Sequence, residues 1–244
     1  MKKNYSKLEL KMVKYKDLIT IPVIENNDPF IIVSQSDIPN KYMPGMTDMQ
    51  KVLGEKIIVR KSVYDKLLSA QTDLQKQYPS LSLFLTYGFR SLEIQTARFT
   101  QRLKDVSKQF FSDPLALYEE VHRSIAVPTV AGHPTGGAID ITIVDIKSNT
   151  FLDFGTKQYD YTTKDYYVFS PYISNKAKKN RMLLRRVMLE VGFAPFDGEW
   201  WHFSYGDREW AYYYNKNSAI YQQRNLGSSG VRLPLGSLNL ASIF

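Results

Sequence analysis

Two short motifs hold the residues of this sequence that could act together in catalysis. His133 and Asp140 bracket a glycine-rich stretch, and Glu199 and His202 flank two tryptophans further along the chain. A catalytic zinc site needs three nitrogen or oxygen ligands, an open fourth position for water and a nearby base. We therefore predict that His133, Asp140 and His202 bind one zinc ion per chain and that Glu199 is the base.

Neither motif is decisive alone, because a histidine beside glycines is more often a turn residue than a ligand. The glycines between His133 and Asp140 permit a tight turn. The apolar run over 138–144 predicts a strand that fixes the direction of Asp140. Residues three apart on an ideal strand lie on opposite faces. Glu199 and His202 therefore meet at one site only if a turn or a bulge separates them.

The amino-acid composition restricts the possible metal ligands and the possible binding partners. The chain contains no cysteine, which excludes disulfides, thiolate zinc ligands and cysteine nucleophiles, so a metal must lie on His, Asp or Glu. The net charge of +8 comes largely from the N-terminus and from a basic segment over 176–186. A basic run on one helix is usually a solvated face. Because no nucleic-acid-binding motif accompanies it, we expect no nucleic acid as the main partner.

The N-terminal residues 1–11 are charged like the start of a signal peptide. No apolar segment of ~7–15 residues follows them, and no apolar run approaches the ~20 residues of a membrane span. We therefore expect no membrane span and a cytoplasmic protein, or a periplasmic or exported one if a leader was removed. The sequence leaves the oligomeric state open.

Hydrophobic periodicity and turn residues predict an α+β domain. We expect helices over 61–78, over 175–191, from Ser91 to about 110 and over 113–124, with Ser91 and Asp113 as the N-caps of the last two. We expect strands over 57–59, 82–86, 138–144 and 199–205. This order predicts a small, mostly antiparallel sheet with helices packed on one side. Residues 41–225 form the predicted domain that carries the zinc site, with an N-terminal extension or edge strands over 1–40 and a tail over 226–244. We interpret the remaining histidine, His122, as a surface or capping residue near the end of its helix.

The motifs resemble those of the zinc D,D-peptidases, and among these the D-alanyl-D-alanine dipeptidases of the VanX type. Residues 131–140 match the family pattern Ser-x-His-x-x-Gly-x-Ala-x-Asp, with Ala131 in place of the serine, and residues 199–202 match Glu-x-Trp-His. Tyr87-Gly88-Phe89-Arg90 resembles a third signature, and segments 152–156 and 159–160 resemble the dipeptidase segment after the first zinc motif. The resemblance implies a hedgehog or D,D-peptidase-like fold.

This resemblance implies zinc-dependent hydrolysis of D-alanyl-D-alanine or a similar small D,D-dipeptide. Arg90 would stabilise the negative oxygen of the tetrahedral intermediate, since a guanidinium stays charged; the alternative is a salt bridge that anchors the next helix. Asp160 resembles the aspartate that receives the ammonium group of the dipeptide, although it could be an ordinary loop carboxylate. Ala131 stands where the family has a serine that contacts the substrate. The long loop over 145–165 would cap the metal cleft.

Two other functions fit the same residues. The chain could be a D,D-carboxypeptidase or an endopeptidase that acts on peptidoglycan stem peptides. It could also be a non-catalytic peptidoglycan-binding protein on the same fold. The presence of His133, Asp140, Glu199, His202 and Arg90 together favours an enzyme, because a binding protein has no physical need of all five.

Overall fold

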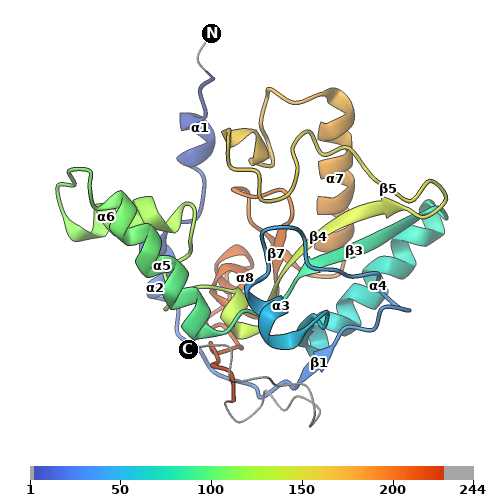
Figure 1. Cartoon of the computed structure of the whole chain (residues 1–244), viewed down its shortest axis with the longest axis horizontal. Coiled ribbons are helices and arrows are strands. Elements are labelled where there is room, and N and C mark those ends of the chain that lie inside the picture. Colours follow the sequence, from blue (N-terminus) through green and yellow to red (C-terminus); the bar gives the residue numbers. More distant parts are fainter. Residues whose placement is uncertain (1–2, 228–244) are drawn as a thin grey trace.

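A five-stranded antiparallel sheet lies at the centre of the molecule (Figure 1). The computed structural model describes residues 3–227. The strand order is β3 (Leu81–Tyr87), β4 (Ala138–Asp145), β7 (His202–Ser204) and β6 (Ala194–Pro195), and β5 (Thr150–Phe151) pairs with β4. A separate antiparallel pair joins β1 (Phe30–Ile32) to β2 (Ile58–Arg60). The predicted α+β class with an antiparallel sheet is confirmed.

The helices begin where the sequence places their caps. Ser91 accepts a hydrogen bond from Ile94 N at the start of α5 (Leu92–Val106), and Asp113 accepts one from Ala116 N at the start of α6 (Pro114–His122). The other helices are α1 (Ser6–Glu9), α2 (Tyr15–Ile19), α3 (Asp48–Leu53), α4 (Lys61–Gln77), α7 (Asn175–Glu190) and α8 (Arg208–Tyr213), with short 3-10 turns η1 (His133–Thr135) and η2 (Lys164–Tyr166). These caps satisfy backbone N–H groups that would otherwise lack a partner in the first turn.

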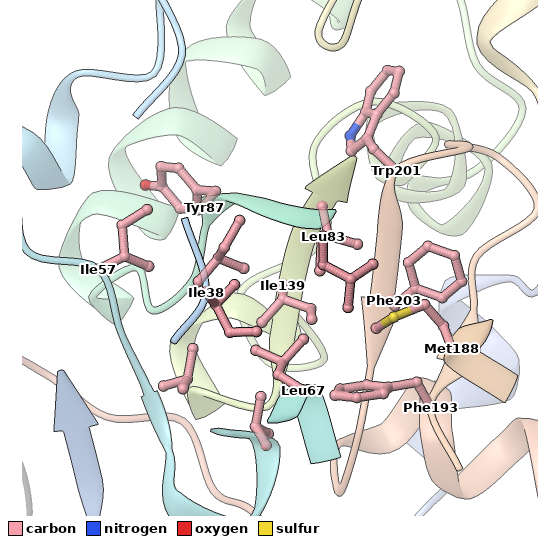
Figure 2. Packing of buried hydrophobic residues seen from close by; sticks show 14 of the residues in the cluster. Ile38, Ile57, Leu67, Leu83, Tyr87, Ile139, Met188, Phe193, Trp201 and Phe203 are labelled. Carbon is pink, nitrogen blue, oxygen red and sulfur yellow. The ribbon is translucent and has the colours of Figure 1, made fainter. Parts of the chain in front are cut away.

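The two faces of the sheet have different roles, which follow from the alternation of side chains along a strand. On β4 the three isoleucines 139, 141 and 143 belong to the main hydrophobic cluster together with residues of α4 and α7. Figure 2 shows Ile139 and Phe203 packed in this cluster with Leu67 of α4 and Met188 of α7. Asp140 alternates with these residues and so projects from the other face of the sheet. Helices on one face therefore leave the opposite face for polar side chains.

A second, smaller hydrophobic cluster lies between α2, α5 and α6. Its buried members are Leu18, Phe99, Val106, Val121, Val127 and Val130. In this cluster α5 and α6 bury their apolar sides against each other and against the N-terminal residues, whereas α4 and α7 pack on the isoleucine face of the sheet.

The N-terminal segment joins two parts of the chain that are distant in sequence. The Tyr5 hydroxyl donates to Oδ1 of Asp165 in η2 at 2.8 Å. A few residues later, the carboxylate of Glu119 on α6 accepts hydrogen bonds from the backbone N–H groups of Tyr15, at 3.0 Å, and Lys16, at 2.9 Å. Figure 1 shows α1 between α6 and the loop that precedes α7. The predicted boundaries at 40 and 225 remain predictions, and the predicted tail lies outside the described residues from 228 onwards.

Candidate metal centre

Asp140 and His202 are brought together by the register of two neighbouring strands. Asp140 of β4 is the direct partner of His202 of β7 in the antiparallel ladder. Directly opposite residues project from the same face, and Asp140 Oδ1 lies 3.0 Å from His202 Nδ1. Both side chains are buried. The sheet itself therefore fixes two of the three predicted ligands.

His133 reaches the same point from η1, just before β4. Its Nδ1 lies 2.8 Å from the carbonyl oxygen of Gly88, so Nδ1–H donates to this carbonyl and Nε2 is left as the free acceptor. Nε2 lies 3.5 Å from Asp140 Oδ1. Gly88 must be a glycine, since an added Cβ would lie 2.5 Å from the carbonyl oxygen of Ile58. The backbone bond sets both the tautomer and the direction of the ring.

The three side chains fit a zinc ion by type and by spacing. One ligand atom from each of His133, Asp140 and His202 lies within 4.8 Å of the others. In a tetrahedral site with metal–ligand distances of about 2.1 Å, neighbouring ligand atoms are roughly 3.4 Å apart. The two spacings to Asp140 Oδ1, 3.0 and 3.5 Å, are close to this value. Two imidazoles and a carboxylate are also a known catalytic zinc donor set.

The electrostatics of the centre also favour a cation. Burial would raise the pKa of Asp140, but His133 and His202 hold it far below its usual range, so the carboxylate stays ionised. Burial disfavours a charge on His202 as well, yet its hydrogen bond to Asp140 and the nearby Glu209 raise its pKa to about 9. The surroundings that favour a proton on His202 equally favour a positive ion between the three side chains.

Glu199 lies at the edge of the same pocket on a turn that precedes β7. The backbone N–H of His202 donates to the carbonyl oxygen of Glu199 at 3.2 Å, which closes this turn. The predicted strand over 199–205 is therefore too long, since β7 begins only at His202. The turn is what allows Glu199 and His202 to line one pocket. Burial raises the pKa of Glu199 to about 7, although His202 and the Tyr161 hydroxyl lower it.

Arg90 lies in the wall of this pocket and is itself buried. Its Nε donates to the Tyr87 hydroxyl at 3.0 Å and its Nη1 donates to Gln95 Oε1 at 2.9 Å. Asp48 Oδ2 lies 3.7 Å from Nε. Burial opposes the charge of Arg90, but Tyr87 and Asp48 outweigh burial and hold its pKa above its usual range. The guanidinium thus remains charged and is held rigidly at the pocket wall.

Of the two predicted substrate-binding residues, Ala131 lines the pocket and Asp160 does not. Ala131 is buried and lines the pocket. Asp160 is not among the lining residues; its carboxylate accepts hydrogen bonds from the backbone N–H of Thr162 at 3.1 Å and from its hydroxyl at 2.6 Å. The predicted capping loop does reach the pocket, through Tyr159 and Tyr161 on either side of Asp160.

Comparison with known proteins agrees with this site. The chain matches the peptidase M15 family, described as D-Ala-D-Ala dipeptidase, over residues 33–223. The chain belongs to this family. It is therefore a peptidase of a metallopeptidase family with a His–Asp–His group of the kind that binds zinc. Across residues 3–227, no helix of this M15 peptidase has the length and apolar character needed to cross a membrane.

Relatives of this M15 peptidase carry related names. The D-alanyl-D-alanine dipeptidase of Synechocystis sp. is 25% identical over 235 residues, which cover 85% of this chain and 94% of that protein. The dipeptidase of Escherichia coli is 34% identical over 79 residues, covering 32% of this chain and 40% of that one. Among solved structures, the LD-carboxypeptidase LdcB has a TM-score of 0.43 at 16% identity, covering 79% of this chain and 75% of that one. VanYB in complex with D-alanine-D-alanine has a TM-score of 0.39 at 14% identity, covering 80% and 92%.

The interpretation of His122 as a surface residue is wrong. The side chain is buried in the M15 peptidase, its Nδ1 accepts a hydrogen bond from Val127 N at 3.2 Å, and its ring lies 6.1 Å from that of Tyr15. Burial lowers the pKa of His122 to about 4. Tyr15 lies in the N-terminal segment, so the pattern of the helix around His122 could not show that this ring covers the histidine. Among the described residues, His122 is not part of the metal-binding group.

Several residues of the centre were not predicted from the sequence. The hydroxyl of Tyr159 donates to Asp140 Oδ2 at 3.0 Å, and that of Tyr161 donates to Glu199 Oε1 at 2.8 Å. Glu209 of α8 places Oε2 3.6 Å from His202 Nε2. The sequence offered one signal, the Tyr-Asp-Tyr stretch within a loop expected to cap the cleft. Nothing in the spacing pointed to Glu209.

Proposed function

We propose that this M15 peptidase hydrolyses the D-alanyl-D-alanine dipeptide with one zinc ion per chain. His133, Asp140 and His202 would hold the ion, and Glu199 would be the general base. The observation that carries the proposal is the meeting of three ligand atoms within 4.8 Å beside Glu199 in one pocket. Zinc in such a site lowers the pKa of a water molecule from about 15.7 towards about 7.

Glu199 is placed for proton transfer. Burial raises its pKa above the usual range of a glutamate, which makes its carboxylate a stronger base. In the proposed reaction, Glu199 takes the proton of the attacking water and later delivers it to the leaving amine. Both steps need a carboxylate in the pocket that is not itself one of the three proposed ligands.

Arg90 would stabilise the negative charge that develops on the peptide oxygen. Two of its nitrogens, Nε and Nη1, are bound to Tyr87 and Gln95. We assign the contact with the substrate oxygen to the remaining nitrogen, Nη2. A donor that is already fixed in direction does not have to reorganise as the charge develops. The rigid setting of Arg90 therefore suits this role, beyond the anchoring of α3 and α5 that it also provides.

A dipeptide is proposed over a longer peptide because of the family relationship. The matching family is described as D-Ala-D-Ala dipeptidase, and the D-alanyl-D-alanine dipeptidase of Synechocystis sp. aligns over 94% of its length. Ala131 lies in the wall of the pocket without a hydroxyl to offer, so we propose that it contributes shape rather than a hydrogen bond. The role of Asp160 in binding the ammonium group remains a prediction that would require its carboxylate to leave Thr162. A cytoplasmic location also remains a prediction.

An assay of the zinc-loaded protein on two substrates tests this proposal. We expect release of D-alanine from D-alanyl-D-alanine, and at least about tenfold lower kcat/KM on a pentapeptide that ends in the same two residues. Faster cleavage of the pentapeptide would instead favour the carboxypeptidase function. Zinc binding without turnover of either substrate would favour a non-catalytic binding protein.

A further inference from the structure

Two tyrosine hydroxyls of one loop reach two different carboxylates of the metal centre. Tyr159 donates to Asp140 Oδ2 at 3.0 Å, and Tyr161 donates to Glu199 Oε1 at 2.8 Å. Asp140 is a proposed ligand and Glu199 is the proposed base, so each hydroxyl serves a group with a different task. In each case the tyrosine binds one carboxylate oxygen, so the other oxygen of the same group is available to another partner.

The backbone of this loop is folded so that residues 159 and 161 point the same way. Tyr159 has a φ of 61°, in the left-handed region that a bulky residue rarely adopts. Asp160, between the two tyrosines, turns its carboxylate to the backbone N–H and hydroxyl of Thr162. An aspartate that bonds its own backbone two residues on stabilises a turn. This contact stabilises the turn that directly follows Tyr159.

The rings of both tyrosines pack on the second tryptophan of the Glu-Trp-Trp-His motif. The ring centroid of Trp201 lies 5.5 Å from the ring centroid of Tyr159 and 6.0 Å from that of Tyr161. The ring of Tyr161 also lies 5.1 Å from that of Tyr166. On the polar side, Thr86 Oγ1 lies 3.2 Å from the Tyr159 hydroxyl. Ring packing and this polar contact together restrict where the two hydroxyls can go.

We infer that Tyr159 and Tyr161 are positioning residues with separate tasks, an inference that rests on the proposed function. By binding Oδ2, Tyr159 directs Asp140 Oδ1 towards both histidines and so sets the affinity for zinc. By binding Oε1, Tyr161 directs the other oxygen of Glu199 towards the attacking water and so sets the rate of the chemical step. Removal of a residue that hydrogen-bonds to a metal ligand commonly changes metal affinity or activity by about 10–100-fold.

Removal of the hydroxyl of Tyr159 tests the first task. For Tyr159→Phe we expect a zinc dissociation constant that rises by about 10–100-fold in competition with a chelator. The loss of zinc affinity is the readout of this task, because the hydroxyl contacts Asp140 and not Glu199. The affinity measurement requires no substrate, so it remains informative whatever the turnover is.

Removal of the hydroxyl of Tyr161 tests the second task. For Tyr161→Phe we expect a zinc affinity within about twofold of the wild type, because neither Tyr161 nor Glu199 is a proposed ligand. We expect kcat on D-alanyl-D-alanine to fall by about tenfold, the loss typical of a hydrogen bond to a charged group, with KM within about twofold. Tyr159→Phe should therefore lose zinc affinity, whereas Tyr161→Phe should lose turnover.

Tyr167→Phe is the matched control, since the Tyr167 hydroxyl donates to Glu9 Oε1 at 3.0 Å in the same part of the chain. It removes a tyrosine–carboxylate bond away from the centre, and we expect zinc affinity and kcat to stay at wild-type values. The inference is overturned if the variants at 159 and 161 behave like this control, or if both lose affinity and turnover together with the melting temperature. A wild-type protein that neither binds zinc nor turns over the dipeptide overturns the proposed function and the inference with it.

Discussion

Asp140 and His202 face each other across strands β4 and β7, with Oδ1 and Nδ1 3.0 Å apart. The backbones of these two proposed ligands cannot move apart without breaking the ladder. His133 completes the group from a turn that Gly88 fixes through a backbone carbonyl. The proposed centre is therefore largely formed by the fold before a metal arrives. The predictions below depend on this preformed geometry.

The role of Glu199 can be separated from metal binding. In Glu199→Gln the side chain keeps its size and one acceptor oxygen but cannot take a proton. We expect zinc affinity to stay within a few-fold of the wild type, and kcat on D-alanyl-D-alanine to fall by about 10²–10⁴-fold. Metal content by atomic spectroscopy, together with steady-state kinetics, checks this. Retained turnover in this variant, or in Glu199→Ala, would rule out the base assignment.

Zinc should stabilise the fold, because a ligand that binds only the native state raises the free energy of unfolding. At a zinc concentration of about 100 times the dissociation constant, the gain is about 2.7 kcal/mol, which corresponds to a melting temperature higher by roughly 5–10 °C. Addition of EDTA should reverse the change in a thermal-shift measurement. His133→Ala should abolish the zinc-induced shift, whereas His122→Asn should preserve it. An undiminished shift in His133→Ala would show that the metal binds elsewhere.

Arg90 should be needed for turnover and not only for packing. Arg90→Lys retains a positive charge but loses the planar fork that Tyr87 and Gln95 hold. We expect kcat to fall by about 10²–10³-fold, with zinc affinity unchanged. Arg98→Ala is the comparison, because Arg98 Nη2 also binds Asp48, at 2.7 Å. If Arg98→Ala matches Arg90→Lys in its effect on kcat, anchoring of Asp48 explains the loss and the assignment of Arg90 to the reacting oxygen fails.

His122 should make stability depend on pH below neutrality. Burial lowers its pKa from 6.5 to about 4 in the folded protein, so the unfolded chain takes up this proton at a higher pH than the native one. The contribution of neutral His122 to the free energy of unfolding is complete above about pH 6.5. It is lost as the pH falls towards 4, with a total loss of about 3 kcal/mol. His122→Asn keeps an acceptor for Val127 N but does not titrate. The melting temperature of the variant should fall less than that of the wild type between pH 7 and 4, and parallel curves would contradict this.

The sequence predicted which residues meet at the candidate centre but not how they converge. The strand predicted over 138–144 is confirmed, and its alternation puts Asp140 on the face opposite the isoleucines, because a period of two is a local property of strands. The same rule applied to 199–205 would have separated Glu199 from His202. A turn closed by one backbone hydrogen bond decides the outcome there, and such a turn depends on packing of the flanking tryptophans rather than on periodicity.

Other features of the site depend on contacts between distant segments. The burial of His122 follows from the ring of Tyr15, more than one hundred positions earlier in the chain. The approach of Tyr159 to Asp140 requires a left-handed backbone at a tyrosine, which residue preferences alone argue against. Ser91 and Asp113, in contrast, were predicted as helix caps and are confirmed, since capping involves only neighbouring residues.

The N-terminal segment has a consequence for how this peptidase should be handled. Tyr5 holds the stretch that follows Tyr161, and Tyr15 covers His122 in the opposite wall of the pocket. The first residues thus contact segments on both sides of the pocket. We expect an affinity tag fused there, or a proteolytic cut near residue 10, to disturb these contacts. A version of the peptidase shortened to residues 33–223, the part that matches the M15 family, should therefore be compared with the full chain before its kinetics are taken as native.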